Sequence, residues 1–256
     1  MNSYNDKEEK IQEMIKDLIR RGGISYQLIV GRFESKILNL KNPKLSYWFA
    51  LNINGANVRA HGQAIINSGD PEWNFNFAKD IALADVKAHE RVVINSRSPK
   101  WNYKFAKYIE GSDVKAHERV VIDSGDLEWN FNFAKNVIGS DAKAHGRVII
   151  NSGDLWWNFN FAQNVGRSDV RAHGRVIINS GDIRWNCNFA ADINGADIRA
   201  HGKVMKEKSS LDNFCNVMKY REVKWYDQES ELELLDNYLD VVMASEEKDA
   251  SKIMTK

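Results

Sequence analysis

The amino-acid sequence repeats with a step of 28 residues, and this step limits what the chain can fold into. All six histidines of the chain are spaced by it: His61, His89, His117, His145, His173 and His201. Five tryptophans follow the same step: Trp73, Trp101, Trp129, Trp157 and Trp185. A period of this size is typical of solenoids and related arrays, whose units pack only on their neighbours. The sequence therefore predicts one extended repeat domain instead of a single globular core.

The unit DPEWNFNFAKDIALADVKAHERVVINS, which begins at Asp70, contains the signals of two helices. Asp70 is suited to accept hydrogen bonds from the free N–H groups at a helix start, and Pro71 lacks the N–H that would be unused at the first helical position. Apolar residues then follow at the spacing of one helix face, at Trp73, Phe77 and Ile81. These residues predict a first helix from Pro71 to about Ile81.

A turn and a second helix are expected in the rest of each unit. Most units place a glycine shortly after the first helix, where a left-handed residue often ends a helix: Gly55, Gly111, Gly139 and Gly195. Leu83 and Arg167 take this place in two units. An aspartate suited to cap a second helix follows at Asp85, Asp113, Asp141, Asp169 and Asp197. We therefore predict an all-α fold, an α-solenoid of tandem 28-residue helix-turn-helix repeats.

A β-structure is the competing interpretation of the same units. The stretch WNFNF alternates between apolar and polar residues, and RVIINSGDLWWNF is compatible with a β-hairpin around a turn. Against it, the alternation is short, and Pro71 and Pro99 would lie at the start of strands. The Lys-Ala-His-Glu-Arg run also has better helix propensity than strand propensity. Helix pairs are our prediction, and the β-hairpin repeat stays open as the alternative.

The array is expected to carry caps, because its terminal units would otherwise expose an apolar face. KEEKIQEMIKDLIRR at the N-terminal end and ESELELLDNYLDVVMA near the C-terminal end both have the pattern of amphipathic helices. The predicted organisation is N-terminal capping helices in 1–41, tandem αα repeats in 42–204, C-terminal capping helices in 205–244 and a mobile tail in 245–256.

Tandem helix pairs that start at Asp-Pro and end near glycine resemble the α-solenoid proteins, which include the HEAT, armadillo and tetratricopeptide families. The resemblance covers roughly residues 42–204 and concerns architecture alone, because the 28-residue step is shorter than the usual units of those families. It implies an all-α solenoid that binds a partner along a groove. No functional residue is carried over from these families.

Composition and sequence ends limit the function classes. The formal net charge of +1 gives no overall attraction to nucleic acid or to an anionic membrane. The start, MNSYNDKEEK, is charged where a signal peptide needs an apolar segment, and no apolar run approaches the length of a membrane span. The two cysteines, Cys187 and Cys215, lie 28 residues apart, and two thiols make no disulfide framework. We expect a soluble cytoplasmic protein.

The histidines are expected to be structural, with no metal and no other cofactor. Stacked helices lie about 8–10 Å apart, whereas a zinc ion needs its nitrogen ligands at about 2.0–2.1 Å. Six equivalent histidines without an evident nucleophile also argue against one catalytic site. We therefore predict packed imidazoles that are hydrogen-bonded to a turn, in a protein that is not an enzyme.

An asparagine follows each repeated tryptophan and forms the asparagine ladder: Asn74, Asn102, Asn130, Asn158 and Asn186. In armadillo-like solenoids such a ladder holds an extended peptide by its main chain, which makes these residues candidates for peptide binding. The alternative, which we favour, is that each asparagine ties the first helix of one unit to the neighbouring unit, because buried amides are usually satisfied internally.

The first helices also carry a face that changes from unit to unit, which we call the variable stripe. Its candidate partner-binding residues are Glu72, Lys100, Lys104, Lys107, Glu128, Trp156 and Arg184. Trp156 is notable because the other units place a charged residue there, and exposed tryptophans are frequent interface hot spots. We predict a non-enzymatic scaffold that binds a partner protein or peptide along this stripe. Neutral drift on a solvent-exposed face is the alternative.

The predicted second helices carry pairs of basic residues four positions apart, which we call the basic ladder: Lys87 and Arg91, Lys115 and Arg119, Lys143 and Arg147, Arg171 and Arg175, and Arg199 and Lys203. Such a ladder is able to follow a phosphate backbone, and helical repeats do bind RNA. Nucleic-acid binding is therefore the alternative function. The sequence does not specify the partner or the oligomeric state.

Overall fold

The computed structural model describes residues 3–20 and 25–208, and in these ranges it contains fourteen helices and no strand. The prediction of an all-α solenoid of helix pairs is confirmed, and the β-hairpin alternative is wrong for the described repeats. The predicted C-terminal capping helices in 205–244 lie outside the described residues, apart from 205–208 at the end of the last helix. Cys215 and the predicted tail in 245–256 also lie outside them.

The chain divides into two compact units, with the boundary between Asp141 and Ala142. The first unit contains α1 (Ser3–Arg20), α2 (Tyr26–Asn39), α3 (Pro43–Asn52), α4 (Val58–Ser68), α5 (Pro71–Asp80), α6 (Val86–Asn95), α7 (Pro99–Tyr108), α8 (Val114–Ser124) and α9 (Leu127–Asn136). The described part of the second unit contains α10 (Ala142–Ser152), α11 (Leu155–Asn164), α12 (Val170–Ser180), α13 (Ile183–Asp192) and α14 (Ile198–Lys208).

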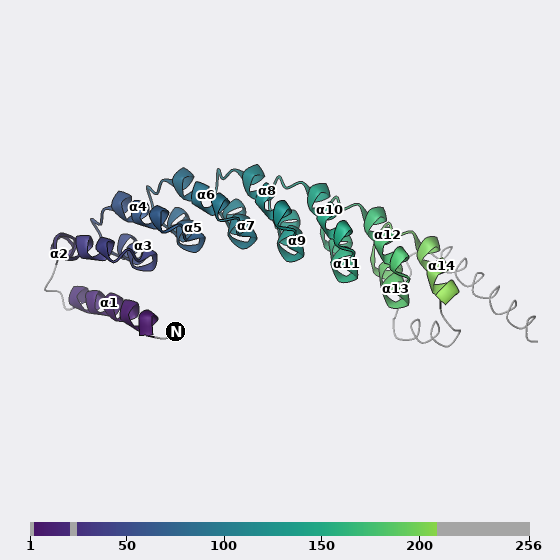
Figure 1. Cartoon of the computed structure of the whole chain (residues 1–256), viewed down its shortest axis with the longest axis horizontal. Helices are drawn as coiled ribbons and strands as arrows, with labels where there is room; N and C mark the ends of the chain where they lie inside the picture. The colour runs from purple at the N-terminus through teal and green to yellow at the C-terminus, as the bar shows by residue number, and fades with distance from the viewer. Residues whose placement is uncertain (1–2, 21–24, 209–256) are drawn as a thin grey trace, which may run out of the picture. The chain divides into compact units, whose positions relative to one another are not determined.

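Each unit is built from two rows of helices (Figure 1). In the first unit α3, α5, α7 and α9 pack one on the next, and α2, α4, α6 and α8 do the same in a second row. In the second unit α11 packs on α13, and α10, α12 and α14 form the other row. We call the odd-numbered helices from α3 onward the first helices, and the even-numbered helices the second helices.

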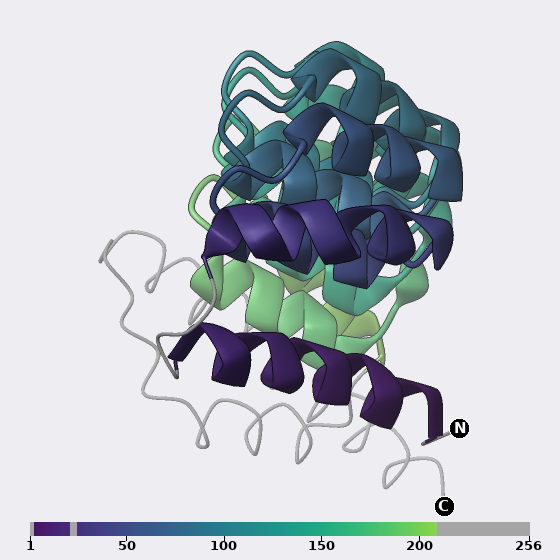
Figure 2. The same cartoon turned by 90° about the vertical axis from the view of Figure 1, so that its left-hand side faces the viewer.

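The N-terminal helices lie within the predicted capping range 1–41. Helix α1 is found at the N-terminal end of the first unit, where it contacts α3 (Figures 1 and 2). Helix α2 packs on α4 in the row of second helices. Its Ile37 is buried and lies 28 residues before the buried Ile65 of α4. The repeat spacing therefore continues into α2.

The helix starts follow the predicted capping chemistry. Asp70 accepts hydrogen bonds from the N–H groups of Glu72 and Trp73 at 2.9 and 3.3 Å, and α5 begins at Pro71. Asp85 accepts from the N–H of Ala88 at 3.0 Å, and α6 begins at the next residue. The turn between the helices contains one left-handed residue, at the glycines that the sequence marks and at Leu83 and Arg167.

The core of each helix pair is centred on one phenylalanine of its first helix. These phenylalanines are at most 1% exposed: Phe49, Phe77, Phe105, Phe133, Phe161 and Phe189. Fully buried Ile or Val side chains of the second helices accompany them, such as Ile65 and Val93. Trp101 of the repeated tryptophans is buried, and the other four are half-buried; Trp73, Trp129 and Trp185 of these pack against the core from its edge. Their rings lie against an aromatic ring of the preceding first helix, as Trp129 does on Tyr103 at 5.5 Å between centroids.

Candidate functional site

A buried hydrogen-bond network links the asparagine and histidine ladders. Asn74 is fully buried, and its amide nitrogen donates to the carbonyls of Ile65 and Asp70 at 3.0 and 2.7 Å. These two bonds fix the amide orientation, so its oxygen is the atom that faces Nδ1 of His89, at 2.7 Å. Nδ1 must therefore carry the hydrogen and donate it, which leaves Nε2 as the unprotonated nitrogen of the neutral ring.

The same pair recurs in the repeats. Nδ1 and the asparagine oxygen are 2.7 Å apart in His117–Asn102, 2.8 Å in His173–Asn158 and 2.7 Å in His201–Asn186. Each imidazole also packs on the core phenylalanine, with centroids 5.0 Å apart in His201–Phe189. Burial lowers the pKa of three of these rings to about 4: His89, His173 and His201. These three histidines are therefore neutral at physiological pH.

The interpretation of the asparagine ladder as a peptide-binding site is wrong for the amides described above. Both donors of Asn74 and of Asn186 bond to backbone carbonyls, and the oxygen of each accepts from a histidine. All five amides of the ladder are fully buried: Asn74, Asn102, Asn130, Asn158 and Asn186. One carbonyl partner belongs to the preceding second helix, so the asparagine ties neighbouring repeats together. An incoming peptide has no access to these groups.

Residues of the variable stripe lie on the outer side of the first helices. Glu72, Lys100, Lys107, Glu128, Trp156 and Arg184 are exposed, and Lys104 is half-buried. Trp156 is 51% exposed although it is a large aromatic residue. Its ring packs edge-on against Trp157, with centroids 4.4 Å apart and an interplanar angle of 84°. This contact limits the freedom of Trp156 and leaves its outer face open to solvent.

Helix α7 carries a cluster of lysines and aromatic rings on the stripe. The Nζ atoms of Lys100 and Lys104 lie 4.9 and 4.4 Å from the Trp101 ring centroid. Lys107 Nζ lies 5.0 Å from the ring of Tyr108, which is 53% exposed. Cations over aromatic faces are attracted by the ring quadrupole. Helix α7 therefore offers a positive, partly aromatic surface, whereas α5 and α9 offer Glu72 and Glu128 at the corresponding place.

The basic ladder lies on the exposed side of the second helices, from Lys87 in α6 to Lys203 in α14. Its arginines make no ion pair within residues 3–20 and 25–208: Arg91, Arg119, Arg147, Arg171, Arg175 and Arg199. These guanidinium groups are therefore free to bind an anion.

The lysines of the ladder differ from its arginines in their contacts within the chain. Lys87 and Lys115 each pair with the glutamate three residues later in the same helix, at 2.8 and 2.7 Å. Lys143 and Lys203 are exposed, but each also has an interaction partner within the chain, so neither is a free cation. The ladder lysines, Lys203 included, therefore already have a partner within the chain, and phosphate binding by the ladder stays a prediction. Phosphate binding by the ladder would depend on its arginines.

Sequence reasoning missed a set of buried glutamates on the second helices. Glu90 is 3% exposed, and its Oε1 accepts from the N–H of Asp113 at 2.5 Å. The same Oε1 lies 3.4 Å from Nε2 of His117, and Oε2 accepts from Lys87 at 2.8 Å. Glu34 repeats this contact with His61 at 3.4 Å and accepts from the N–H of Asn57 at 2.6 Å.

The sequence did contain a signal for these glutamates. Aligned on the 28-residue step, the position holds either glutamate (Glu34, Glu90 and Glu118) or glycine (Gly62, Gly146, Gly174 and Gly202). From His61 onward the difference reads AHE or AHG in the sequence. We call the two kinds Glu-type and Gly-type sites. Each site except that of Gly202 also includes the histidine that follows one repeat later.

Comparisons with protein-family models, with curated proteins and with solved structures give no match. The class of this protein is therefore defined by its fold, which is a helical-repeat solenoid. No helix in residues 3–20 and 25–208 is long and apolar enough to cross a membrane. The same residues contain no group of three or more His, Cys, Asp or Glu side chains that could hold a metal ion.

Proposed function

We propose that this solenoid is a scaffold that binds a partner protein or peptide through the variable stripe of its first helices. The observation that carries the proposal is the exposure of Trp156, at 51%, in a helix whose other large aromatic residues are at least half-buried. The fold does not need an aromatic residue there, because the corresponding residues are Glu72, Lys100, Glu128 and Arg184.

The setting of Trp156 matches that of an interface anchor. Tryptophan buries a large area at low conformational cost, and Trp157 already restricts its ring. Asn160, on the same stripe, donates to the Trp156 carbonyl at 2.8 Å. Anchors of this kind contribute about 2 kcal/mol or more to binding when surrounding residues exclude water.

The variation along the stripe supports recognition by several helices of one array. The buried Phe, Asn and His side chains provide the folding interactions in each repeat, so the outer residues are free to differ. They change from acidic on α5 to basic and aromatic on α7 and to tryptophan on α11. A partner that contacts successive first helices would therefore meet a different chemistry at each step.

The test uses the full chain and a random peptide library displayed on phage. Peptides selected on the wild-type protein are synthesised, and their dissociation constants are measured for wild type and Trp156→Ala. We expect Trp156→Ala to weaken binding about tenfold or more, while the thermal midpoint stays within about one degree, as is usual for surface changes.

Arg119→Glu, on the exposed side of a second helix, is the matched control and should leave peptide affinity unchanged. Equal binding by wild type and Trp156→Ala would contradict the assignment of the variable stripe as the recognition surface.

Nucleic-acid binding by the basic ladder is the second candidate. The exposed arginines without an ion pair support it, since each phosphate contact releases counterions and makes binding depend on salt. The reverse-charge variant Arg119→Glu/Arg147→Glu/Arg175→Glu should then abolish binding of RNA or DNA at low salt. Lys203→Gln is the comparison at a ladder lysine that already has a partner, and it should weaken binding less. Absence of measurable binding by the wild-type protein at low salt would contradict this candidate and leave the protein scaffold.

A further inference from the structure

At the Gly-type sites a glycine, instead of a carboxylate, faces the buried Nε2 of the following histidine. His201 is fully buried, and its Nε2 has no hydrogen-bond partner in the described part of the chain. This nitrogen points at Gly174, because a Cβ atom added there would lie 3.3 Å from it. In the first unit, His117 occupies the same position in its repeat but faces the Glu90 carboxylate. The glycine therefore removes the group that would face the imidazole.

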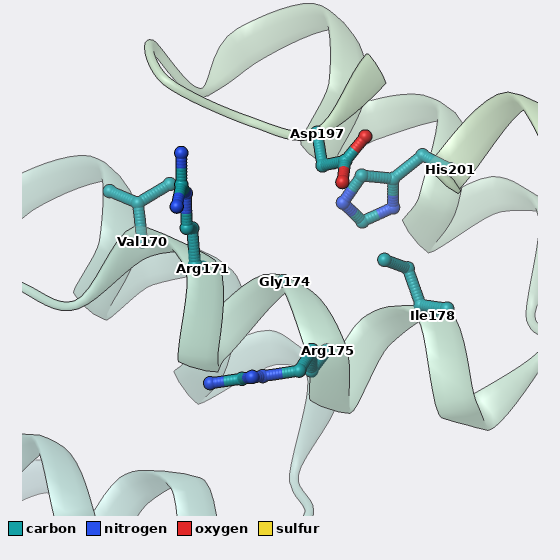
Figure 3. Close-up of a pocket in the computed structure, with 7 residues that line it drawn as sticks. All are labelled: Val170, Arg171, Gly174, Arg175, Ile178, Asp197 and His201. Atoms are coloured by element: carbon teal, nitrogen blue, oxygen red, sulfur yellow. The ribbon is translucent and has the colours of Figure 1, made fainter. Parts of the chain in front are cut away.

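A pocket of about 140 Å³ occupies this place in the second unit. It is lined by Val170, Arg171, Gly174, Arg175 and Ile178 of α12 and by Asp197 and His201 at the start of α14. Figure 3 shows Asp197 and His201 above the turn of α12 that contains Gly174, with Arg171 on the opposite side. At about 30 Å³ for one water, the volume is sufficient for a carboxylate and an adjoining methylene.

The groups around the pocket correspond one by one to the groups that hold Glu90. Asp197 takes the place of Asp113, and its backbone N–H makes no hydrogen bond to the described residues. Arg171 takes the place of Lys87, whose ammonium binds Glu90 Oε2. His201 takes the place of His117. The Gly174 pocket therefore presents the surroundings of a bound carboxylate without the carboxylate.

We propose that the Gly-type sites bind a carboxylate group from outside the chain, with the Gly174 pocket as the clearest case. The group would accept hydrogen bonds from the Asp197 N–H and from Nε2 of protonated His201, with Arg171 on its open side. By the same repeat position, His89 with Gly62 and His173 with Gly146 form two further sites. This inference goes beyond the proposed scaffold function, because it concerns the second helices and not the variable stripe.

Charge balance sets the condition for binding. Neutral His201 presents a lone pair at Nε2, which repels a carboxylate, so the bound state requires a proton on that nitrogen. Burial opposes this proton in the free protein and lowers the pKa of His201 to about 4, while Asp197 acts in the opposite direction. An anion in the pocket favours the imidazolium, so binding takes up one proton.

The charged groups around His201 are compatible with a second carboxylate. Asp197 immediately precedes α14, Arg171 and Arg175 belong to α12, and the neighbouring side chains Asn186 and Phe189 of α13 are uncharged. In the first unit Asp113 already occupies the position of Asp197 next to buried Glu90. The fold therefore already holds a buried carboxylate beside the capping aspartate when a lysine and a histidine accompany it.

The test is a titration of the full chain with sodium formate, followed by the nitrogen shifts of the histidine rings in NMR spectra. Sodium chloride at equal ionic strength is the control for general salt effects. We expect saturable movement of the Nε2 signals of His201, His89 and His173 toward protonated imidazole, and none for His117, which already faces Glu90. Affinity should increase as pH falls from about 7 to about 5, by at most tenfold per pH unit for one proton.

Two further ligands define the source and class of the bound group. N-acetylglutamate amide has a single carboxylate on its side chain, and its binding would point to an acidic residue of a partner, whereas binding of formate alone would point to a small free ion. Both outcomes support a carboxylate site. Inorganic phosphate that binds at His201 as tightly as formate would overturn the assignment to carboxylate, and no saturable shift with any carboxylate would overturn the site itself.

Exchange of the two side chains gives a reciprocal control. Gly174→Glu should supply an internal carboxylate and abolish the formate response of His201 while the response of His173 remains. Glu90→Gly should create a formate response at His117. Gly174→Gln fills the same space without charge and should also block formate. A formate response of His201 that survives in folded Gly174→Glu would overturn the proposal, as would Glu90→Gly protein in which His117 stays unresponsive.

Discussion

Two regions of the molecule use the same histidine in different surroundings, α6 to α8 in the first unit and α12 to α14 in the second. In both, an asparagine accepts from Nδ1 and the ring packs on a buried phenylalanine. In the first region Nε2 faces the Glu90 carboxylate, and in the second it faces the Gly174 pocket. One side chain therefore decides whether a carboxylate or an open pocket lies opposite the buried nitrogen.

The difference between Glu90 and Gly174 separates residues that stabilise a repeat from a position that is available for binding. Nε2 lacks a hydrogen-bond partner in both regions, at His117 and at His201, but only the Glu-type site has a carboxylate that accepts from the Asp113 N–H and from Lys87. The first helix is unaffected by the choice, because Asn186 and Phe189 keep the positions that Asn102 and Phe105 have in the Glu-type repeat. The solenoid is thus able to place open and closed sites along one unchanged frame.

Of the changes considered, lowering the pH should have the largest effect on the stability of the protein. The folded-state pKa of His89, His173 and His201 is about 4, below the ordinary value of about 6.5. Because the unfolded chain gains protons first, stability is fully present above about pH 6.5 and is lost as pH falls toward about 4, by roughly 3 kcal/mol for each of these buried rings.

Urea unfolding across this pH range measures the loss. Gly174→Glu should reduce it, since a carboxylate opposite His201 lets the folded state bind the proton. An unfolding midpoint that does not change between about pH 6.5 and about pH 4.5 would contradict the neutral buried imidazoles.

Removal of the ladder asparagine should lower the stability of the protein by a similar amount in the two regions. Asn102→Ala and Asn186→Ala each delete two bonds to backbone carbonyls and leave a histidine N–H unpartnered. We expect a loss of about 3–5 kcal/mol from these buried groups, seen as a lower urea midpoint. A large difference between the two variants would show that the frame is not shared by the two regions.

The repeat step, the aspartate caps and the left-handed turns were predictable because each depends on local backbone chemistry. The different packing of Trp73 and Phe77 was not predictable. Both residues lie on the same helix face, and periodicity does not specify which neighbouring helix each side chain contacts. Phe77 enters the core of the helix pair, whereas Trp73 packs on Tyr47 of the preceding first helix. Glu90 was missed because a charged residue is expected on the surface, and its burial depends on contacts with Asp113 and His117 in the next repeat.

Alanine placed at the same repeat position should affect the two site types differently. Glu90→Ala leaves the Asp113 N–H and His117 Nε2 without the carboxylate, and should cost about 2 kcal/mol. Gly174→Ala gains about 1 kcal/mol of helix propensity, offset by a Cβ atom only 3.1 Å from Phe189, so its net effect should be close to zero. Urea midpoints of the two variants measure this difference. Equal losses would contradict the separation into Glu-type and Gly-type sites.

The smallest expected effect lies in the turn that precedes the capping aspartate. Leu83 and Arg167 have φ values of 65° in their turns, whereas the turns before His117 and His201, one of each site type, use Gly111 and Gly195. A left-handed conformation costs a residue with a Cβ atom about 1–2 kcal/mol. Glycine avoids this cost, but its greater freedom in the unfolded chain lowers the stability of the folded protein by about 0.5–1 kcal/mol.

Leu83→Gly should therefore stabilise the protein by about 0.5 kcal/mol, because Leu83 is 95% exposed and loses no packing. Gly111→Ala is the reverse change at the equivalent turn and should destabilise by about 1 kcal/mol. Thermal midpoints of the two variants test the pair. If Leu83→Gly lowers the midpoint, the left-handed leucine is not strained.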